Sequence, residues 1–533
     1  MTLTALPNAE RGRRKLQLEP DRPIELAAQQ RIPGSFQLVL ALYVILIGTL
    51  PTIVQAIAFG VEGGSGSEFA AAMASGLTHD ILLLLPIIIV GRHPLGILHP
   101  LLIAVLLWPL LTHVPNVVDT WGGWAGVLSG SPVDPPHFFA LPSRSPSTIW
   151  AAIAKTNLIK IVSLACTYAG FFLLRGKQAV RRANVHMPSV ASVRTIMLAL
   201  IGVSILVLII FLRARGGLNE HLTSLGGGRF KELSGYGPAL MLVQMGTVAI
   251  YIWAAASPDE IRKPLFIAVL VAVCGALFIS NGSRGGALEI PLMVGIIWGL
   301  RSRKIPWKTA LILLPFMFLA VGFLGAIRTA SWSGSTAAET IQESTWAGAL
   351  ERSKLEAAAR NAASADEAVV ERGLEVSGGH LLGISYAAAF TSVIPRPLWP
   401  DKPRGVGQMF ARLFYGASLS GTSIPVRPEI EMYWNFGMPG VVLLSILYGA
   451  LLHLAYQIYS RWYPNPFATV LYMLFLTAFH FSSDRVVQLE QRSVLVVVCY
   501  FIVAMFAPRR DVVSDVARAQ LAIRQRRSQT APS

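Results

Sequence analysis

The stretch Val193-Arg-Thr-Ile-Met-Leu-Ala-Leu-Ile-Gly-Val-Ser-Ile-Leu-Val-Leu-Ile-Ile-Phe-Leu212 decides the fold class of this chain. After Arg194 it carries no charged residue. A helix needs about 20 apolar residues to cross the hydrocarbon core of a bilayer. The whole chain is 53% hydrophobic and only 14% charged, which is unlike an ordinary soluble protein. We therefore predict an all-α polytopic membrane protein embedded in a lipid bilayer.

Similar apolar stretches recur along the chain and predict about 12 transmembrane helices. Their approximate positions are 36–59, 69–90, 95–114, 149–174, 193–212, 238–256, 264–280, 285–300, 307–327, 431–459, 467–481 and 493–506. The first is long for the apolar core of a signal peptide, so we expect a retained anchor. The predicted organisation is a basic tail at 1–35, transmembrane helices 1–9 at 36–327, a large loop at 328–430, transmembrane helices 10–12 at 431–506 and a second basic tail at 507–533.

The formal net charge is +16, but the cations gather at helix ends instead of on one soluble face. This distribution indicates retention of basic loops in the cytoplasm, so we expect no nucleic-acid partner. Short basic loops alternate with every second predicted span, and both tails are rich in arginine. Both termini are therefore expected in the cytoplasm, and the 328–430 segment between the ninth and tenth helices is expected on the periplasmic side.

The first half of the 328–430 segment is acidic. Residues 339–375 hold eight acidic and four basic side chains, and the Glu356–Arg360 pair has the spacing of a surface helix. We interpret this part as a solvated cover or lid and assign no chemistry to it.

The second half is basic and rich in proline. It contains Ile394-Pro-Arg-Pro-Leu-Trp-Pro-Asp-Lys-Pro403, which includes Arg396 and Lys402 and is followed by Arg404. The prolines exclude continuous helix and stiffen the backbone. Stiffness favours a cation site for a leaving phosphate, because such cations must be in position beforehand. The alternative is an ordinary connection whose basic side chains reach the lipid headgroups.

Polar residues elsewhere supply further candidates. Arg284 lies in Ser280-Asn-Gly-Ser-Arg-Gly-Gly286, where helix-start amides and a guanidinium suit an anion, although a single arginine in a glycine turn is better explained as a simple interfacial anchor. Arg328 follows the ninth predicted span on the same side. Lys155 and Lys160, near the outer end of the fourth span, are expected to extend towards the headgroups.

Two residues are candidates for proton transfer. His380 is the single histidine of the 328–430 segment, and an imidazole exchanges a proton near neutral pH. Glu431 is a carboxylate at the start of the tenth predicted span, which is costly unless it is paired or functional. The alternatives are a hydrogen-bonding histidine and an acid that stabilises a helix amino terminus.

Several common sites are missing from the sequence. No outward-facing loop has an Asp-x-Asp pair, and the chain has no Walker loop and no Gly-x-Ser-x-Gly or His-Glu-x-x-His motif. The three cysteines, Cys166, Cys274 and Cys499, all lie in predicted spans and suggest no disulfide framework. We therefore expect no metal and no cofactor.

The layout and three motifs resemble the Wzy-type O-antigen or oligosaccharide repeat-unit polymerases. The motifs are Ser-Arg-Gly at 283–285, the proline-rich string at 394–403 and Glu431-Met-Tyr-Trp-Asn-Phe-Gly437. The resemblance implies a metal-independent glycosyltransferase of the bacterial inner membrane that polymerises undecaprenyl-pyrophosphate-linked oligosaccharide at the periplasmic face. It also implies a flippase and a chain-length regulator as partners in the same pathway.

The same resemblance implies roles for individual residues. The pyrophosphate would be bound by Arg284, Arg328, Arg396, Lys402 and Arg404, and Glu431 or His380 would remove the acceptor proton. Two alternatives stay open at this point. One is an O-antigen ligase-like transferase with the same donor, and the other is a transporter or flippase of lipid-linked oligosaccharide. Transporters often contain internal repeats, which we do not find between the two halves of the sequence.

Overall fold

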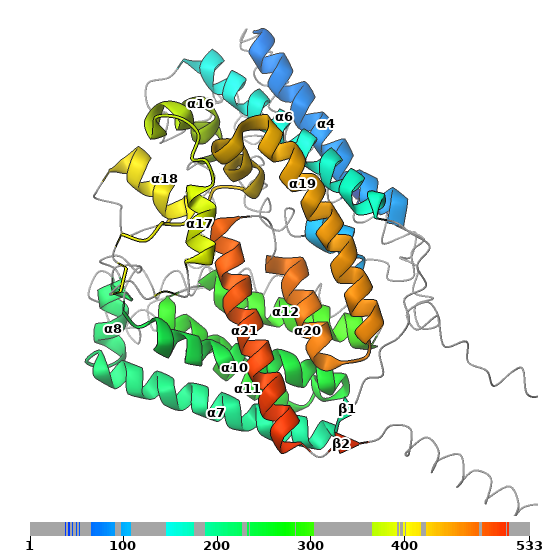
Figure 1. Ribbon diagram of the computed structural model, residues 1–533, viewed down its shortest axis with the longest axis vertical. Coiled ribbons are helices and arrows are strands. Elements are labelled where there is room, and N and C mark those ends of the chain that lie inside the picture. Colours follow the sequence, from blue (N-terminus) through cyan, green and yellow to red (C-terminus); the bar gives the residue numbers. More distant parts are fainter. Residues whose placement is uncertain are drawn as a thin grey trace, which may run out of the picture.

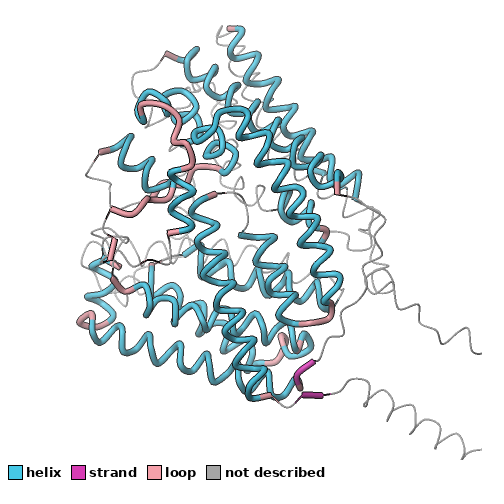
Figure 2. The backbone as a smooth tube through the Cα atoms, viewed as in Figure 1, coloured by secondary structure: helices cyan, strands magenta, loops and turns pink. Residues whose placement is uncertain are grey.

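A computed structural model gives the fold of the chain. It describes residues 66–90, 98–107, 145–174, 187–225, 232–233, 235–282, 284–302, 365–391, 394, 398–399, 401–416, 423–478, 482–507 and 509–510, together with single positions between 38 and 53. Almost all of the described backbone is helical (Figure 2).

The long helices are α4 (Ser67–Val90), α6 (Pro146–Leu173), α7 (Val190–Ala214), α10 (Gly237–Ala256), α11 (Pro264–Asn281), α12 (Arg284–Ser302), α19 (Pro428–Trp462) and α21 (Ser483–Phe506). The shorter ones are η3 (Leu102–Leu107), α8 (Leu218–Ser224), η5 (Pro258–Glu260), α16 (Ala365–Ser377), α17 (Ile384–Phe390), α18 (Val406–Tyr415) and α20 (Pro466–Ala478). Two-residue strands, β1 (Met187–Pro188) and β2 (Arg509–Arg510), pair antiparallel.

Seven of these helices are long and apolar enough to cross a membrane, namely α4, α6, α7, α10, α11, α19 and α21. The prediction of a polytopic helical membrane protein is confirmed at this level. Two further predicted spans form helices that are not both long and apolar enough to cross a membrane. α12 contains Pro291 and three charged residues, and the 13 residues of α20 reach only about 20 Å at the helical rise of ~1.5 Å per residue.

Three predicted spans cannot be compared with helices of the structure. The spans at 36–59 and 95–114 lie largely outside the described residues, and the span at 307–327 lies wholly outside them. The total of about 12 spans and the sides of the membrane on which the loops and termini lie stay predictions.

The helices form two groups that α20 and α21 connect. α4 and α19 pack along α6 in the upper part of Figure 1, while α7, α11 and α12 pack on α10 in the lower part. α20 contacts both α19 and α10, and α21 packs against α20 and α10. The central core lies around α10, where Trp253 is buried and meets Phe266 edge to face at 4.9 Å between ring centroids.

Glycines let α6 and α19 approach backbone to backbone. A Cβ atom at Gly170 would lie 2.0 Å from the Ile446 carbonyl oxygen, and one at Gly449 would lie 2.0 Å from the Thr167 carbonyl oxygen. Small residues at a crossing allow such contact, which drives helix association where lipid removes the hydrophobic contrast. Hydroxyls of Ser163 and Ser445 meet at 2.8 Å in the same interface.

Replacing these glycines with alanine is expected to separate the two helices. Gly170→Ala and Gly449→Ala should lower the thermal unfolding midpoint of the purified protein in detergent, because overpacking costs about 1–3 kcal/mol. Gly202→Ala on α7 is the matched control, since a Cβ there meets nothing within 4 Å. Equal midpoints for all three variants would contradict this role for the crossing.

Candidate functional site

The described part of the 328–430 segment folds onto the ends of membrane helices. α16 packs against α6 and α19, and α17 and α18 contact the start of α21 (Figure 1). Ala368, Val369 and Val370 of α16 are buried in a cluster with Ile159 and Trp434. The interpretation of residues 339–375 as a solvated cover is therefore wrong for 365–375, because one face of α16 is part of the core. Residues 339–364 lie outside the described residues.

Glu431 is fully enclosed at the start of α19. Its Oε1 accepts a hydrogen bond from the Ser385 hydroxyl at 2.6 Å, and its Oε2 accepts one from the Ser483 backbone N–H at 3.0 Å. These bonds join α17, α19 and the first residue of α21. The carboxyl group therefore has two structural partners and no exposed surface in this arrangement.

Asn435 extends the same network by one helical turn. Its amide donates to the Ser385 hydroxyl at 2.9 Å and to the Glu431 carbonyl at 2.8 Å. Its side-chain oxygen accepts from the Gly383 N–H at 2.9 Å. Two of these three contacts are to Gly383 and Ser385, so the Asn435 side chain positions the start of α17 against α19.

The helical conformation of α19 is interrupted at Gly437. This residue has φ 66° and ψ −163°, a backbone region essentially restricted to glycine, and Pro439 two residues later has no N–H. The carbonyls of Trp434 and Asn435 accept bonds instead from Leu381 N and Leu382 N, each at 3.1 Å. The Asn-Phe-Gly motif is thus a helix break that binds the chain at 380–382.

His380 lies beside this break. Its Nδ1 is 3.2 Å from the Trp434 carbonyl, and its Nε2 lies 3.5 Å from where a Cβ on Gly437 would be. A carbonyl only accepts, so Nδ1 carries the proton, and in the neutral ring Nε2 is left as the acceptor. The residue is exposed, unlike Glu431. Of the two predicted proton acceptors, His380 is therefore the one whose side chain is exposed.

The predicted cations are in different situations. The Lys402 ammonium donates to the carbonyls of Ile394 at 2.7 Å and Thr391 at 3.3 Å, so it holds the proline-rich turn against the end of α17. Arg404 is half-buried and has no hydrogen bond or ion pair with the described residues. Arg284 begins α12, but its side chain lies outside the described part, as do Arg328 and Arg396 altogether.

A buried charged cluster between α4, α6, α16 and α19 was not predicted. Arg427 donates from Nε and from its backbone N–H to the two oxygens of Asp366, at 3.1 Å and 3.0 Å. Lys160 is 8% exposed and is influenced electrostatically by Arg427, Glu367 and Asp366. Burial raises the pKa of the Glu367 carboxyl, and the Lys160 ammonium opposes that shift.

The expectation that Lys160 extends towards headgroups is wrong, because protein encloses its side chain. The sequence signal that was available is a second lysine in mid-helix, five residues after Lys155. Lys155 is placed differently, with its ammonium 5.6 Å from the centre of the Tyr433 ring.

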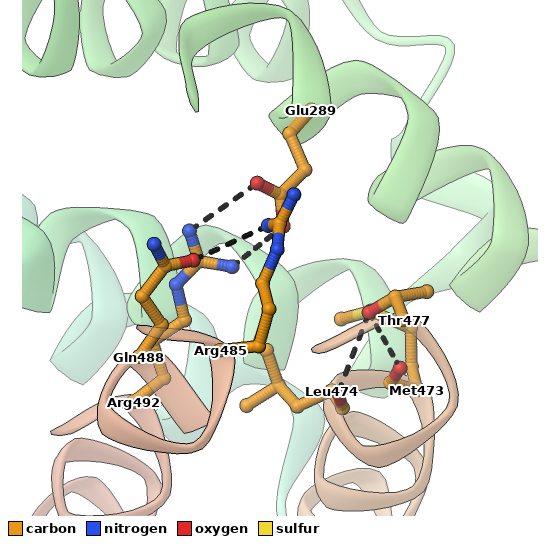
Figure 3. Close-up of polar contacts among 7 residues, drawn as sticks. All are labelled: Glu289, Met473, Leu474, Thr477, Arg485, Gln488 and Arg492. Carbon is orange, nitrogen blue, oxygen red and sulfur yellow. Dashed lines mark hydrogen bonds and ion pairs between the residues drawn. The ribbon is translucent and has the colours of Figure 1, made fainter. Parts of the chain in front are cut away.

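A second buried charge pair lies in the lower helices (Figure 3). Arg492 of α21 donates to both oxygens of Glu289 of α12, at 2.6 Å and 3.4 Å. Arg485 lies two turns earlier on α21 and donates to Gln488 at 3.3 Å. Both arginines lie on α21, which begins at Ser483, ten residues before the span predicted at 493–506. Among the described residues no three His, Cys, Asp or Glu side chains are grouped to hold a metal ion.

Removing the Glu431 carboxyl is expected to destabilise the protein. Glu431→Ala leaves the Ser483 N–H without its acceptor, which costs about 1–3 kcal/mol for a buried donor. Glu431→Gln keeps one carbonyl oxygen and should be milder. Thermal midpoints in detergent measure both, with Glu375→Ala on the exposed face of α16 as control. A midpoint for Glu431→Ala equal to that of the control would show that the carboxyl does not join these helices.

The Arg492–Glu289 pair is expected to behave as a unit. Arg492→Met or Glu289→Met alone leaves one buried charge unpaired, a loss of about 3–5 kcal/mol in comparable sites. The double variant removes both charges and should recover most of the thermal stability. A double variant as unstable as the sum of the two single variants would contradict direct pairing.

No known protein family, curated protein or solved structure matches this chain. The resemblance to the Wzy-type polymerases rests on the motifs near 283–285, 394–403 and 431–437 and on the membrane layout.

Proposed function

We propose that the chain is a membrane glycosyltransferase that polymerises undecaprenyl-pyrophosphate-linked oligosaccharide repeat units on the periplasmic side of a bacterial inner membrane. The observation that carries the proposal is the orientation of His380. Its Nδ1 is bound to the Trp434 carbonyl, which leaves Nε2 of this exposed residue as proton acceptor next to a helix break. Arg404 and the turn held by Lys402 belong to the same folded segment.

In the proposed reaction a sugar hydroxyl of the incoming unit attacks the anomeric carbon of the growing chain. The new glycosidic bond forms as the bond from that carbon to the pyrophosphate oxygen breaks, and lipid pyrophosphate leaves with the electron pair. His380 Nε2 takes the hydroxyl proton. Arg404, with Arg284, Arg328 and Arg396, would stabilise the leaving pyrophosphate through charge-assisted hydrogen bonds.

Lys402 and Glu431 have supporting roles in this scheme. The Lys402 ammonium is engaged with two backbone carbonyls, so it positions the turn that carries Arg404. Glu431 fixes α17 against α19 and α21 through Ser385 and Ser483. Both residues thus hold the site in place, and we assign the general base to His380.

Transport of a lipid-linked oligosaccharide is the second candidate. Charges enclosed within membrane helices mark transport pathways in many proteins, and Lys160 and the Arg492–Glu289 pair are of this kind. In liposomes, movement of labelled lipid-linked sugar across the bilayer without lengthening would favour transport over polymerisation.

The test of polymerisation uses the purified protein with a defined undecaprenyl-pyrophosphate oligosaccharide, with and without a chelator. We expect a ladder of products that survives chelation. His380→Ala should slow it by about 10²–10⁴-fold, the usual range for loss of a general base. Arg404→Ala should slow it at least ~10-fold, and Arg404→Lys should restore little because the planar fork is lost.

Arg372→Ala is the matched control, because Arg372 pairs with Glu375 on the surface of α16 in the same segment. It should leave the ladder unchanged. A normal ladder from His380→Ala would remove the base assignment. Transfer of a single unit to lipid A core without any ladder would favour a ligase.

A further inference from the structure

Exposed apolar side chains gather around α17 and the turn that follows it. Leu382, Phe390 and Leu398 are 78–79% exposed, and Ile384 and Trp399 are also exposed. Together these five residues form what we call the α17 patch. Lys402 bonds the carbonyls of Thr391 and Ile394, which keeps the residues around Phe390 close to the turn at 398–399. Exposed large apolar side chains that are grouped in this way indicate a binding surface.

The patch continues into the lipid-facing surface of the membrane helices. Tyr386 of α17 stacks on Phe436, with ring centroids 6.2 Å apart and planes 1° apart. Phe436 is itself exposed, and on the same helix beyond the break so are Leu443 and Leu447. The exposed apolar side chains of α19 therefore lead from the patch to the part of this helix that faces lipid.

The neighbouring helix α21 places the membrane boundary close to this level. The exposed large apolar side chains of a membrane helix mark the part that faces lipid. On α21 they begin at Val494, and α17 packs beside the earlier part of that helix. α17 thus occupies a position where the lipid-facing surface of α21 has not yet begun.

The residues that flank the patch suit lipid headgroups. Arg404 follows the patch in the sequence, and the Lys402 ammonium binds the backbone carbonyl of Ile394 next to it. Trp399 has the amphipathic ring that is enriched at membrane interfaces, and basic side chains nearby favour phosphate groups. A surface for a soluble protein partner has no reason to continue into a lipid-facing helix surface.

We propose that the α17 patch lies in the headgroup region of one bilayer leaflet and binds lipid. The 328–430 segment is then, in this part, an interfacial structure and not a solvated loop. His380 and Arg404 lie at the depth of lipid phosphates. The inference does not rest on the proposed glycosyltransferase activity, because it concerns only where the segment lies.

Spin labels can test this position in the full-length protein. Single cysteines are introduced as Phe390→Cys and Leu398→Cys in a background in which the three free cysteines, Cys166, Cys274 and Cys499, are replaced by serine or alanine. Leu447→Cys gives the lipid-exposed reference, and Glu375→Cys on α16 gives the water-exposed one. The labelled proteins are reconstituted in vesicles of phosphatidylethanolamine and phosphatidylglycerol.

The readout is the ratio of collision rates with oxygen, which concentrates in lipid, and with a water-soluble nickel chelate. Labels at 390 and 398 should give ratios several-fold above that at 375 and below that at 447, which lies deeper along α19. Ratios at 390 and 398 equal to that at 375 would overturn the proposal, provided that 447 reports lipid and so shows a correctly inserted protein. Failure of polymerisation with an interfacial result at 390 and 398 would reject only the proposed function.

Discussion

The backbone contact between α6 and α19 is the constraint on which the rest of the structure depends. Gly170 and Gly449 each face a carbonyl of the other helix, so neither position has room for even one methyl group. Once α6 and α19 are fixed at this distance, α4 packs on α6 and α16 fits against both helices. The segment that carries His380 and Lys402 is held through these contacts. A local steric requirement in the membrane helices thus determines where the polar segment lies.

Buried charges follow a second rule, which is pairing across helices. Arg492 satisfies Glu289, Arg427 satisfies Asp366, and Glu431 is satisfied by neutral donors from Ser385 and Ser483. Each group joins elements distant in the sequence, and an unpaired charge in such surroundings is strongly destabilising. Lys160 has only longer-range electrostatic partners in the described part of the chain. The buried polar groups therefore give the helices a unique register as well as stability.

Prediction from the sequence succeeded where apolar residues form a run as long as a membrane-crossing helix. It gave the helical membrane class and the approximate positions of the seven long apolar helices that the structure describes, because a stretch of about 20 apolar residues is typical of a membrane-crossing helix. It failed for contacts that depend on tertiary packing. From the sequence, Lys160 is expected to extend along lipid towards the headgroups. The structure shows that its side chain is enclosed, and that α16 packs on the helix that carries it. The motif at 431–437 does not indicate that Glu431 is enclosed. Nor does it indicate that His380, more than fifty residues earlier in the chain, is exposed beside Gly437.

The missing N–H of Pro439 has a consequence for how the imidazole is held. In an uninterrupted helix, residue 439 would donate to the Asn435 carbonyl; Pro439 has no N–H, so that carbonyl accepts from Leu382 without competition from its own helix. Any other amino acid at 439 supplies a competing donor within the helix. The N–H that Pro439 lacks therefore leaves an acceptor that secures Leu382, and with it the stretch of chain that carries His380.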